Sequence, residues 1–491
     1  MKKTPLIALS IALLMCSCNS NNGNFSSGNG LPGKGSITQD NFDIAPRNRY
    51  EGVGDVMPFY DNGKMNIFFL NNSTSGGLFY HPINLLVTAD NVHYENKGTV
   101  LNYERDSSSI EAALGTGSVY KDDNGTYHFY YTGHNSSSSS GLPYHEGICH
   151  ATSTDLVNWT KVPEDTFFGS HNDFRDPFVY KYNNQYHMIV TTNYGGKGYL
   201  ALYKSTNLSS WTYDSVFYEQ NQTYNMECPS IVNYDGYWYL FFSEQGAERV
   251  VRYRYKKNYN DAWITPDEDK IDTQGFYAGR ALLGKDNRFF IYGWCADKQY
   301  EWDAGNFDWG GDLVCHELDS LTNGQLVVKA PKEFNDLINH EVQYKQRDGS
   351  YITSIDKDGS YDFEKLSKNV TRISFNITVK KEQGFLLLNF GRDAGKISPV
   401  GYVLDFQNGK LLFKNDIDSL TDLGTNQLAR NFSFQEGKTY AVDIYIDKDV
   451  AILYLNKSIA MSTRMYAMPE EEFAFVLEGT DASVGNIKFY E

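Results

Sequence analysis

The sequence has no surplus of positive charge. Its 491 residues include 61 Asp and Glu but only 44 Lys and Arg, which gives a formal net charge of -17. Nucleic-acid binding depends on clustered Lys and Arg that displace condensed counterions, so this balance argues against a nucleic-acid partner. A neutral polysaccharide meets no such objection. The acidity also has a simpler interpretation, as the charge that keeps a secreted protein soluble.

The apolar stretch at the amino terminus lacks the length of a transmembrane helix. It covers residues 6–15 and follows the basic start Met1-Lys2-Lys3. A basic start and a short apolar core are typical of a secretory signal, which is too short to span a bilayer permanently. We therefore predict a signal peptide over residues 1–18 and an exported protein.

The end of this signal resembles bacterial lipoprotein signals. The small Ser17 precedes Cys18, which makes Cys18 the predicted lipid-modified residue and Cys16 the alternative. The Asn-, Ser- and Gly-rich residues that follow predict a flexible tether over residues 19–44. The protein would then be lipid-anchored to the cell envelope, on the periplasmic side or the outer-membrane surface. A soluble periplasmic protein cut after the same signal is the alternative.

Cysteine is scarce in the rest of the chain, where it occurs at Cys149, Cys228, Cys295 and Cys315. An oxidising compartment permits disulfides, and four cysteines allow three pairings between which the sequence does not choose. Buried free thiols are the favoured alternative. The cysteines do not have the spacing of zinc ligands, and we predict neither a metal nor a cofactor.

A repeat with tight turns fills the first two thirds of the chain. Five hairpins align on their turns, at residues 57–70, 118–131, 177–190, 229–242 and 280–293. Asn-Gly and Asp-Gly pairs supply the positive dihedrals of tight turns, and β-branched and aromatic residues flank them. Successive copies lie about fifty to sixty residues apart, a period that suggests radial blades of about four strands. This predicts a five-bladed β-propeller over residues 45–335.

Three acidic residues stand near the start of repeated strands, each shortly before a proline. They are Asp55, Asp176 and Glu227 in the first, third and fourth copies. Equivalent ends of repeated strands cluster in space, so the three carboxyl groups should share one cleft. Paired carboxyl groups of this kind make hydrolysis of a glycosidic bond the leading interpretation.

Beyond residue 345 the pattern changes to short alternating strands. Examples are residues 371–379, 401–406, 440–446 and 451–455, separated by polar turns. Such strands are typical of an antiparallel sandwich. The whole chain is thus predicted to be all-β, a five-bladed β-propeller followed by a C-terminal antiparallel β-sandwich over residues 345–491.

Four short motifs in order resemble glycoside hydrolase family 32, the invertases, inulinases and levanases. They are Arg175-Asp176-Pro177, Glu227-Cys228-Pro229, Phe276-Tyr277-Ala278 and residues 330–334. The resemblance covers nearly the whole mature chain. It implies a glycosidase that cleaves β-fructofuranosidic bonds in fructans or fructo-oligosaccharides.

The resemblance also implies a role for each acid. Asp55 would be the nucleophile, Glu227 the acid and base, and Asp176 the residue that holds sugar hydroxyls. A retaining enzyme of this kind keeps its two reacting carboxyl groups about 5 to 5.5 Å apart and forms a covalent intermediate that water releases. The match at Asp55 is the loosest, because the family usually has Trp-Met-Asn-Asp-Pro-Asn-Gly where this chain has residues 52–58, Gly-Val-Gly-Asp-Val-Met-Pro.

Further residues are predicted to bind substrate. They are Arg175, Tyr277, Trp294 and Ser118, with Trp302 and Trp309 as further aromatic platforms. Each has a structural alternative: aromatic residues in propeller strands usually belong to the core, Arg175 could form an ion pair with Asp176, and an Asp before a strand often caps a turn.

Three hypotheses remain. The first is the retaining β-fructosidase, and the second is an inverting arabinofuranosidase or xylosidase of another five-bladed family that also uses two Asp and one Glu. The third is a lipid-anchored glycan-binding protein without catalysis. The expected partner is carbohydrate, the membrane is met only through the anchor, and the oligomeric state is unknown.

Overall fold

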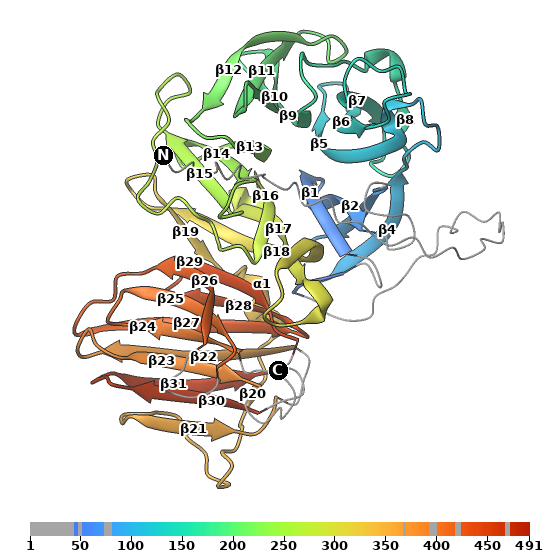
Figure 1. The fold of residues 1–491 in the computed structure, drawn as a ribbon. Coiled ribbons are helices and arrows are strands. Elements are labelled where there is room, and N and C mark those ends of the chain that lie inside the picture. The colour runs from blue at the N-terminus through green and yellow to red at the C-terminus, as the bar shows by residue number, and fades with distance from the viewer. Residues whose placement is uncertain are drawn as a thin grey trace, which may run out of the picture. The chain divides into compact units, whose positions relative to one another are not determined.

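The structure, a computed structural model, describes residues 44–47, 52–72, 81–366, 370–391, 400–417, 424–466 and 472–491. The chain divides into residues 1–35 and 36–491, and all described residues belong to the second unit. The predicted signal peptide, Cys18 and the tether up to residue 43 lie outside the described residues. Figure 1 shows that the described chain is built almost entirely of strands.

Antiparallel strands form five blades in the described part of the chain. Blade 1 contains β1 (Gly52–Asp61), β2 (Lys64–Asn72), β3 (Ile83–Thr88) and β4 (Tyr94–Leu101), and blade 2 contains β5 (Ala113–Lys121), β6 (Tyr127–His134), β7 (Glu146–Ser153) and β8 (Thr160–Lys161). Blade 3 contains β9 (Phe174–Tyr182), β10 (Gln185–Tyr194), β11 (Lys197–Ser205) and β12 (Thr212–Glu219), and blade 4 contains β13 (Met226–Tyr234), β14 (Tyr237–Glu244) and β15 (Val251–Lys256). Blade 5 contains β16 (Phe276–Leu283), β17 (Phe289–Lys298), β18 (Phe307–Ser320) and β19 (Leu326–Lys329).

Blade 4 departs from the predicted pattern of about four strands. It has three strands in the described residues, and isolated bridges from Arg252 to Lys270 and from Tyr255 to Ile264 extend its outer edge. The chain there runs past β15 in an irregular path that hydrogen-bonds to the strand at single points. A single bridge leaves no repeat of alternating residues for a sequence pattern to detect.

The tight turns follow from residues that tolerate positive φ. Asn62 and Gly63 join β1 to β2 with φ of 50° and 78°, and Asp235 and Gly236 join β13 to β14 with 48° and 79°. Two consecutive positive φ values define the turn whose twist matches the flanking strands. Local turn chemistry therefore fixes the register of these hairpins.

The ring of blades closes between its first and last members. Val53 on β1 pairs with Gly311 on β18, and the Leu313 amide donates to the Pro46 carbonyl at 3.0 Å. This pairing joins blades 1 and 5 into one eight-stranded sheet. The inner strands β1, β5, β9, β13 and β16 contact one another in that order around the ring.

Each inner strand carries an irregularity near its start. The register with the neighbouring strand shifts between Val53 and Val56, Gly115 and Gly117, Arg175 and Phe178, Glu227 and Ser230, and Tyr277 and Arg280. In the last three blades a non-glycine residue adopts positive φ there, at Asp176 (60°), Cys228 (51°) and Ala278 (51°). Bulges of this kind re-aim side chains and are common beside active sites.

Two six-stranded sheets, which form the sandwich, follow the short helix α1 (Lys332–Leu337). One sheet has the order β20 (Glu341–Val342), β31 (Ser483–Tyr490), β22 (Val370–Val379), β27 (Lys438–Asp447), β28 (Val450–Leu455) and β29 (Ile459–Arg464). The other has the order β21 (Gly359–Phe363), β30 (Phe473–Glu478), β23 (Phe385–Phe390), β24 (Val400–Asp405), β25 (Lys410–Asn415) and β26 (Thr425–Asn431).

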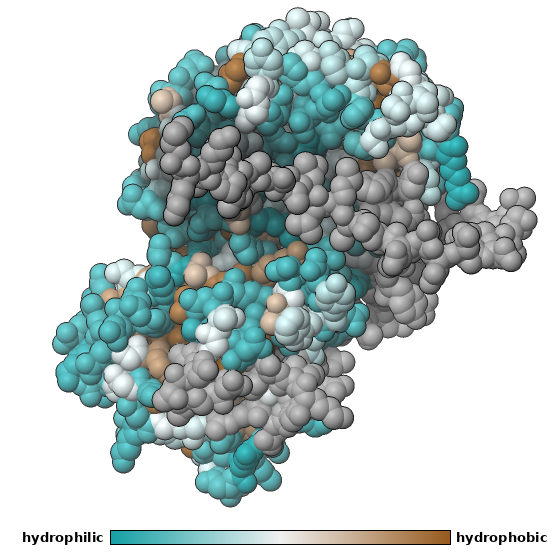
Figure 2. Space-filling model, in the orientation of Figure 1, coloured by the Kyte–Doolittle hydropathy of each residue, from teal (hydrophilic) through white to brown (hydrophobic). Residues whose placement is uncertain are grey.

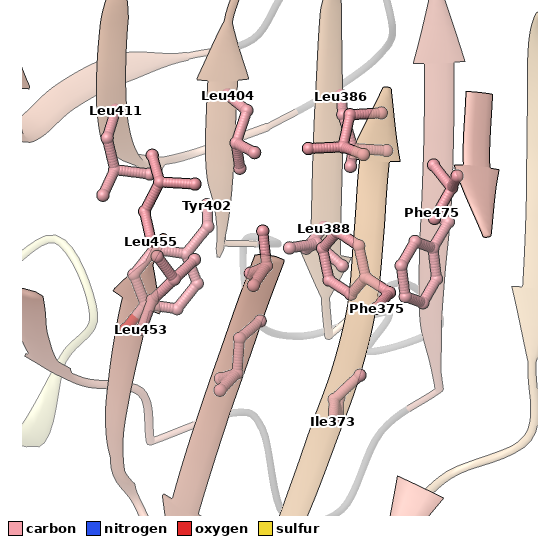
Figure 3. Packing of buried hydrophobic residues seen from close by; sticks show 14 of the residues in the cluster. Ile373, Phe375, Leu386, Leu388, Tyr402, Leu404, Leu411, Leu453, Leu455 and Phe475 are labelled. Carbon is pink, nitrogen blue, oxygen red and sulfur yellow. The ribbon is translucent and has the colours of Figure 1, made fainter. Parts of the chain in front are cut away.

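The core of this sandwich lies between its two sheets. Figure 3 shows Ile373 and Phe375 from β22 and Leu453 from β28 facing Leu388 and Phe475 from the opposite sheet. All five side chains are buried. Alternation of inward apolar residues along β22 is the pattern that the sequence displayed, because each second residue of a strand points to the same face.

A buried arginine ties the sandwich to the propeller. Arg464 on β29 is 1% exposed and forms ion pairs with Asp312 on β18, with Asp297 on β17 at 3.2 Å and with Asp449 at 2.8 Å. It also donates to the Cys295 carbonyl at 3.2 Å. A buried cation needs such partners, since an unpaired one would carry the full cost of desolvation.

Polar residues dominate the part of the surface that Figure 2 colours. Hydrophilic residues cover most of the coloured area on this face, as the charge of the sequence leads one to expect. Among the described residues no helix has the length and apolar character needed to cross a membrane. Cys149, Cys228, Cys295 and Cys315 are all buried free thiols, the alternative that the sequence favoured.

Candidate active site

The structure brings the three predicted acids into one cluster. Asp55 lies on β1, Asp176 on β9 and Glu227 on β13, each at the irregularity of its inner strand. Asp55 is the fourth residue of its strand, Asp176 the third and Glu227 the second. The bulges, and not the strand ends, therefore set the direction of these side chains. They are close enough for their charges to interact: Glu227 acts on Asp55, Asp55 on Asp176, and Asp176 on Glu227.

Two side-chain donors hold the Asp55 carboxyl. Thr116 Oγ1 on β5 donates to Oδ2 at 2.9 Å, and Trp294 Nε1 on β17 donates to Oδ1 at 3.2 Å. These donors come from blades 2 and 5, on either side of blade 1. Asp55 therefore does not cap a local turn, which was the structural alternative for it.

Glu227 is held by a cation and a phenol. Arg175 donates from Nη2 to Oε1 at 2.8 Å, and Tyr277 donates from its hydroxyl to Oε2 at 2.8 Å. Arg175 also donates to Asp173 at 2.8 Å and to Glu146 at 3.3 Å. Of the three clustered acids, the one to which Arg175 donates is thus Glu227, whereas the sequence suggested Asp176 or the sugar.

Asp176 is the most buried of the three acids, at 3% exposure. Its Oδ2 accepts the Cys228 amide at 2.9 Å, and its own amide donates to Thr132 Oγ1 at 2.9 Å. The positive φ of both Asp176 and Cys228 turns these groups toward one another. The bulges of blades 3 and 4 are therefore linked by a hydrogen bond between an acid and the backbone.

Arg280 is a central residue that sequence reasoning missed. It is 1% exposed, and its guanidinium donates to the Gly117 carbonyl at 2.7 Å and to the Asp176 carbonyl at 3.2 Å. Its charge lowers the pKa values of Asp55 and Asp176. The signal was present in the sequence, since a single Arg interrupts the otherwise uncharged run of residues 276–283.

Burial dominates the electrostatics of the cluster. It raises the pKa of Asp55, of Asp176 and of Glu227 above their ordinary values, because a low-dielectric site disfavours the charged form. Arg175 opposes this effect at Asp176 and Glu227. The three carboxyl groups thus hold protons more tightly than free carboxyl groups do.

Two predicted sugar platforms are buried against the acids instead. Trp294 is 0% exposed and Tyr277 is 5% exposed, and each donates its polar hydrogen to a carboxyl group. Their rings meet at 5.6 Å in an edge-to-face arrangement. The structure therefore places both as positioning residues for Asp55 and Glu227.

Ser118, which was predicted to bind substrate, accepts a backbone hydrogen bond between two blades. Its Oγ accepts the Val179 amide at 3.0 Å, and the side chain is buried between blades 2 and 3. Ser230 accepts the Ala281 amide at 3.1 Å between blades 4 and 5 in the same way. The two serines serve packing between blades, where each satisfies a buried amide.

Comparison with known proteins identifies the family. The model described as "Glycosyl hydrolases family 32 N-terminal domain" matches residues 57–329, more than half of the chain. The chain belongs to glycosyl hydrolase family 32. The matched range includes Asp176 and Glu227 and begins two residues after Asp55.

Known relatives resemble this family 32 chain over most of its length. Sucrose-6-phosphate hydrolase of Escherichia coli is 24% identical over 71% of this chain and 74% of its own length. Sucrose-6-phosphate hydrolase of Streptococcus mutans is 24% identical over 88% of both chains. The structure of fructan 1-exohydrolase IIa from Cichorium intybus in complex with 1-kestose superposes with a TM-score of 0.70 at 14% identity, covering 90% of this chain and 95% of that one.

These findings confirm the predicted family, the all-β fold of propeller and sandwich, and the prediction of a glycosidase. No group of His, Cys, Asp or Glu in the described part of the chain is arranged to hold a metal ion. The groups that the site offers for chemistry are its carboxyl groups and their hydrogen-bond donors.

Replacing Asp55 by the neutral isostere Asn should stabilise the fold at neutral pH. The raised pKa of Asp55 means that its ionised form is disfavoured in the folded state. This lowers the free energy of unfolding. The full loss is present at pH values above the pKa of Asp55 in the folded state, and there is no loss at pH values below its pKa in the unfolded state. We expect Asp55→Asn to raise the free energy of unfolding at pH 7, and the gain to shrink as the pH falls toward 4, measured by urea unfolding at a series of pH values.

Asp61→Asn is the matched control on the same strand. Asp61 accepts hydrogen bonds from Lys121 at 3.1 Å and from Tyr127 at 2.7 Å, so its loss should leave stability at pH 7 unchanged or lower. Lower stability of Asp55→Asn at pH 7 would contradict the stated cost of ionising Asp55.

Proposed function

We propose that the protein hydrolyses β-fructofuranosidic bonds in fructans, fructo-oligosaccharides or sucrose by a retaining double displacement. The observation that carries the proposal is the convergence of Asp55, Asp176 and Glu227 in one desolvated cluster within a family 32 propeller. Relatives named for hydrolysis of a sucrose phosphate and of inulin support the choice of bond.

In the first step Asp55 attacks the anomeric carbon of the fructosyl unit. Glu227 gives its proton to the departing oxygen, so the bond electrons leave with a neutral hydroxyl group. In the second step Glu227 takes a proton from water, whose oxygen replaces Asp55 at the anomeric carbon. Two inversions at one carbon retain its configuration.

The electrostatics of the cluster suit an ionised nucleophile at Asp55 and a protonated acid at Glu227. Asp55 accepts two neutral hydrogen bonds that favour its ionised form. Burial and the charge of Asp176 raise the pKa of Glu227, so this group keeps its proton to a higher pH than a free carboxyl group does. That proton is the one that Glu227 delivers.

Asp176 is assigned to the hydroxyl groups of the fructosyl ring. Its Oδ2 is already occupied by the Cys228 amide, and this contact fixes the direction of the second oxygen. Hydrogen bonds to ring hydroxyls that strengthen as positive charge develops would stabilise the transition state in preference to the bound substrate.

The test is hydrolysis of sucrose, 1-kestose, inulin and levan, with product configuration read by proton and carbon NMR before mutarotation. We expect wild type to release β-fructofuranose, and Glu227→Gln to lose at least about a thousandfold in kcat through loss of the transferable proton. Asp61→Asn, remote from the cluster, should retain wild-type rates. An inverted product would favour the arabinofuranosidase type, and binding without turnover would favour a glycan-binding protein.

The Tyr277 hydroxyl should contribute to the position of the alkaline limb of the pH profile. Its hydrogen bond stabilises ionised Glu227 and so lowers the pKa of that group, while burial raises it above the ordinary 4.5. Tyr277→Phe should therefore raise the pKa of Glu227 and move the alkaline limb of kcat/KM to higher pH. A limb that stays in place or moves to lower pH would contradict Glu227 as the proton donor.

We further propose that the enzyme is exported and anchored through a lipid on Cys18. The basic start, the apolar stretch 6–15 and Ser17 before Cys18 support this assignment. Labelling with radioactive palmitate in a bacterial host should mark wild type and Cys16→Ala but not Cys18→Ala. Label retained by Cys18→Ala and lost by Cys16→Ala would move the anchor to Cys16, and absence of label from all three would leave an unanchored protein.

A further inference from the structure

Glu146 is a buried acid outside the catalytic trio. It is the first residue of β7 in blade 2, and its side chain is 13% exposed. Its Oε2 accepts the Phe174 amide at 2.7 Å and Arg175 Nη1 at 3.3 Å. One carboxylate oxygen from blade 2 therefore holds the backbone of the first residue of β9 in blade 3 and the side chain of the second.

The guanidinium of Arg175 presents its two ends to different acids. Its Nη1 donates to Asp173 at 2.8 Å and to Glu146 at 3.3 Å. Its Nη2 donates to Glu227 at 2.8 Å and to Gln245 at 3.3 Å. Because the guanidinium is planar and rigid, the contacts at one end direct the other. The Asp173 side chain is 46% exposed, so Glu146 is the buried one of the two acids that hold the Nη1 end.

Glu146 carries its charge at neutral pH. Burial alone would raise its pKa, but His134, the charge of Arg175 and the Phe174 amide outweigh burial and hold the pKa of Glu146 below its usual value. His134 Nδ1 lies 3.7 Å from Oε1 of Glu146. Arg175 thus has an anion at its Nη1 end while its Nη2 end meets the proton donor Glu227.

We propose that Glu146 is a positioning residue for the proton donor: it directs Arg175 toward Glu227 and offsets part of the positive charge that Arg175 exerts there. This inference rests on the proposed function. A cation beside a carboxyl group favours its ionised form, whereas a proton donor must start protonated. Arg175 without a compensating anion would therefore cost Glu227 its proton at a lower pH.

Several other groups act on the same acids. The titratable groups facing Glu227 include Tyr277 from β16, Asp176 from β9, Asp55 from β1 and the neighbouring thiol of Cys228. Those facing Glu146 and Arg175 include His134 from β6 and Asp173. All of these groups remain when Glu146 alone is replaced, so a change in the pKa of Glu227 then reports on Glu146.

Two substitutions separate the charge of Glu146 from its reach. Glu146→Gln keeps an acceptor oxygen but removes the charge, so the pKa of Glu227 should fall and the alkaline limb of kcat/KM for sucrose should move to lower pH by about one unit. The plateau at lower pH should stay near wild type. Glu146→Asp keeps the charge but shortens the side chain, so the limb should stay in place while kcat falls roughly tenfold through a misplaced Arg175.

Glu111→Gln is the matched control. The Glu111 side chain is 8% exposed and pairs with Lys161 at 3.0 Å, so this variant also loses a buried charge, but from a pair that does not include Arg175. Its alkaline limb should match wild type. Thermal midpoints show that each variant is folded, and carbon-13 NMR titration of the Glu227 carboxyl, assigned by its loss in Glu227→Gln, measures the pKa directly.

A Glu227 pKa that is unchanged or higher in folded Glu146→Gln, or an equal shift in Glu111→Gln, would overturn the inference alone. Wild type that turns over none of the sugars would overturn the proposed function, and the NMR titration would still decide whether Glu146 sets the pKa of Glu227.

Discussion

Three carboxyl groups that repel one another in a desolvated place impose the constraint on which the rest of this structure depends. Burial raises the pKa of all three, and an isolated buried charge costs on the order of several kcal/mol. The protein offsets this cost with Arg175, Arg280 and the polar hydrogens of Thr116, Trp294 and Tyr277. These groups come from blades 2, 3 and 5, so the whole ring contributes to holding acids that stand on blades 1, 3 and 4. The cluster of acids therefore lowers the stability of the fold in favour of reactivity, as in other active sites.

The propeller meets this demand through the irregular starts of its inner strands. A regular strand alternates its side chains between two faces, and neighbouring residues such as Arg175 and Asp176 would point apart. The bulges break that alternation, and positive φ at Asp176, Cys228 and Ala278 redirects backbone amides as well as side chains. Such conformations cost about 1 kcal/mol or more for residues with a Cβ atom and persist only where surrounding contacts fix them. Their recurrence in successive blades indicates that the geometry of the site is a property of the repeat.

Sequence reasoning succeeded where short-range chemistry decides the structure. Asn62-Gly63 and Asp235-Gly236 marked tight turns, and from these the hairpins and the repeat followed. It failed where the outcome depends on which distant residues meet. The partner of Arg175, the packing role of Ser118 and the ring of Trp309 on Gly54 are contacts between blades, which no local pattern encodes. Arg280 was overlooked because a lone cation in an apolar strand shows its partners only once the ring has closed.

The pairing of Val53 with Gly311 has a consequence for biosynthesis. Asp55 and Trp294 are hydrogen-bonded although 239 residues separate them in the sequence. Asp55 is therefore translated long before its partner. Until blade 5 has been translated, β1 remains an edge strand with open backbone hydrogen bonds, which is a known route to misassembly. A nascent or clipped polypeptide that ends before β18 therefore lacks the strand that closes the ring beside Asp55, and its open edge needs protection from aggregation until the last blade arrives.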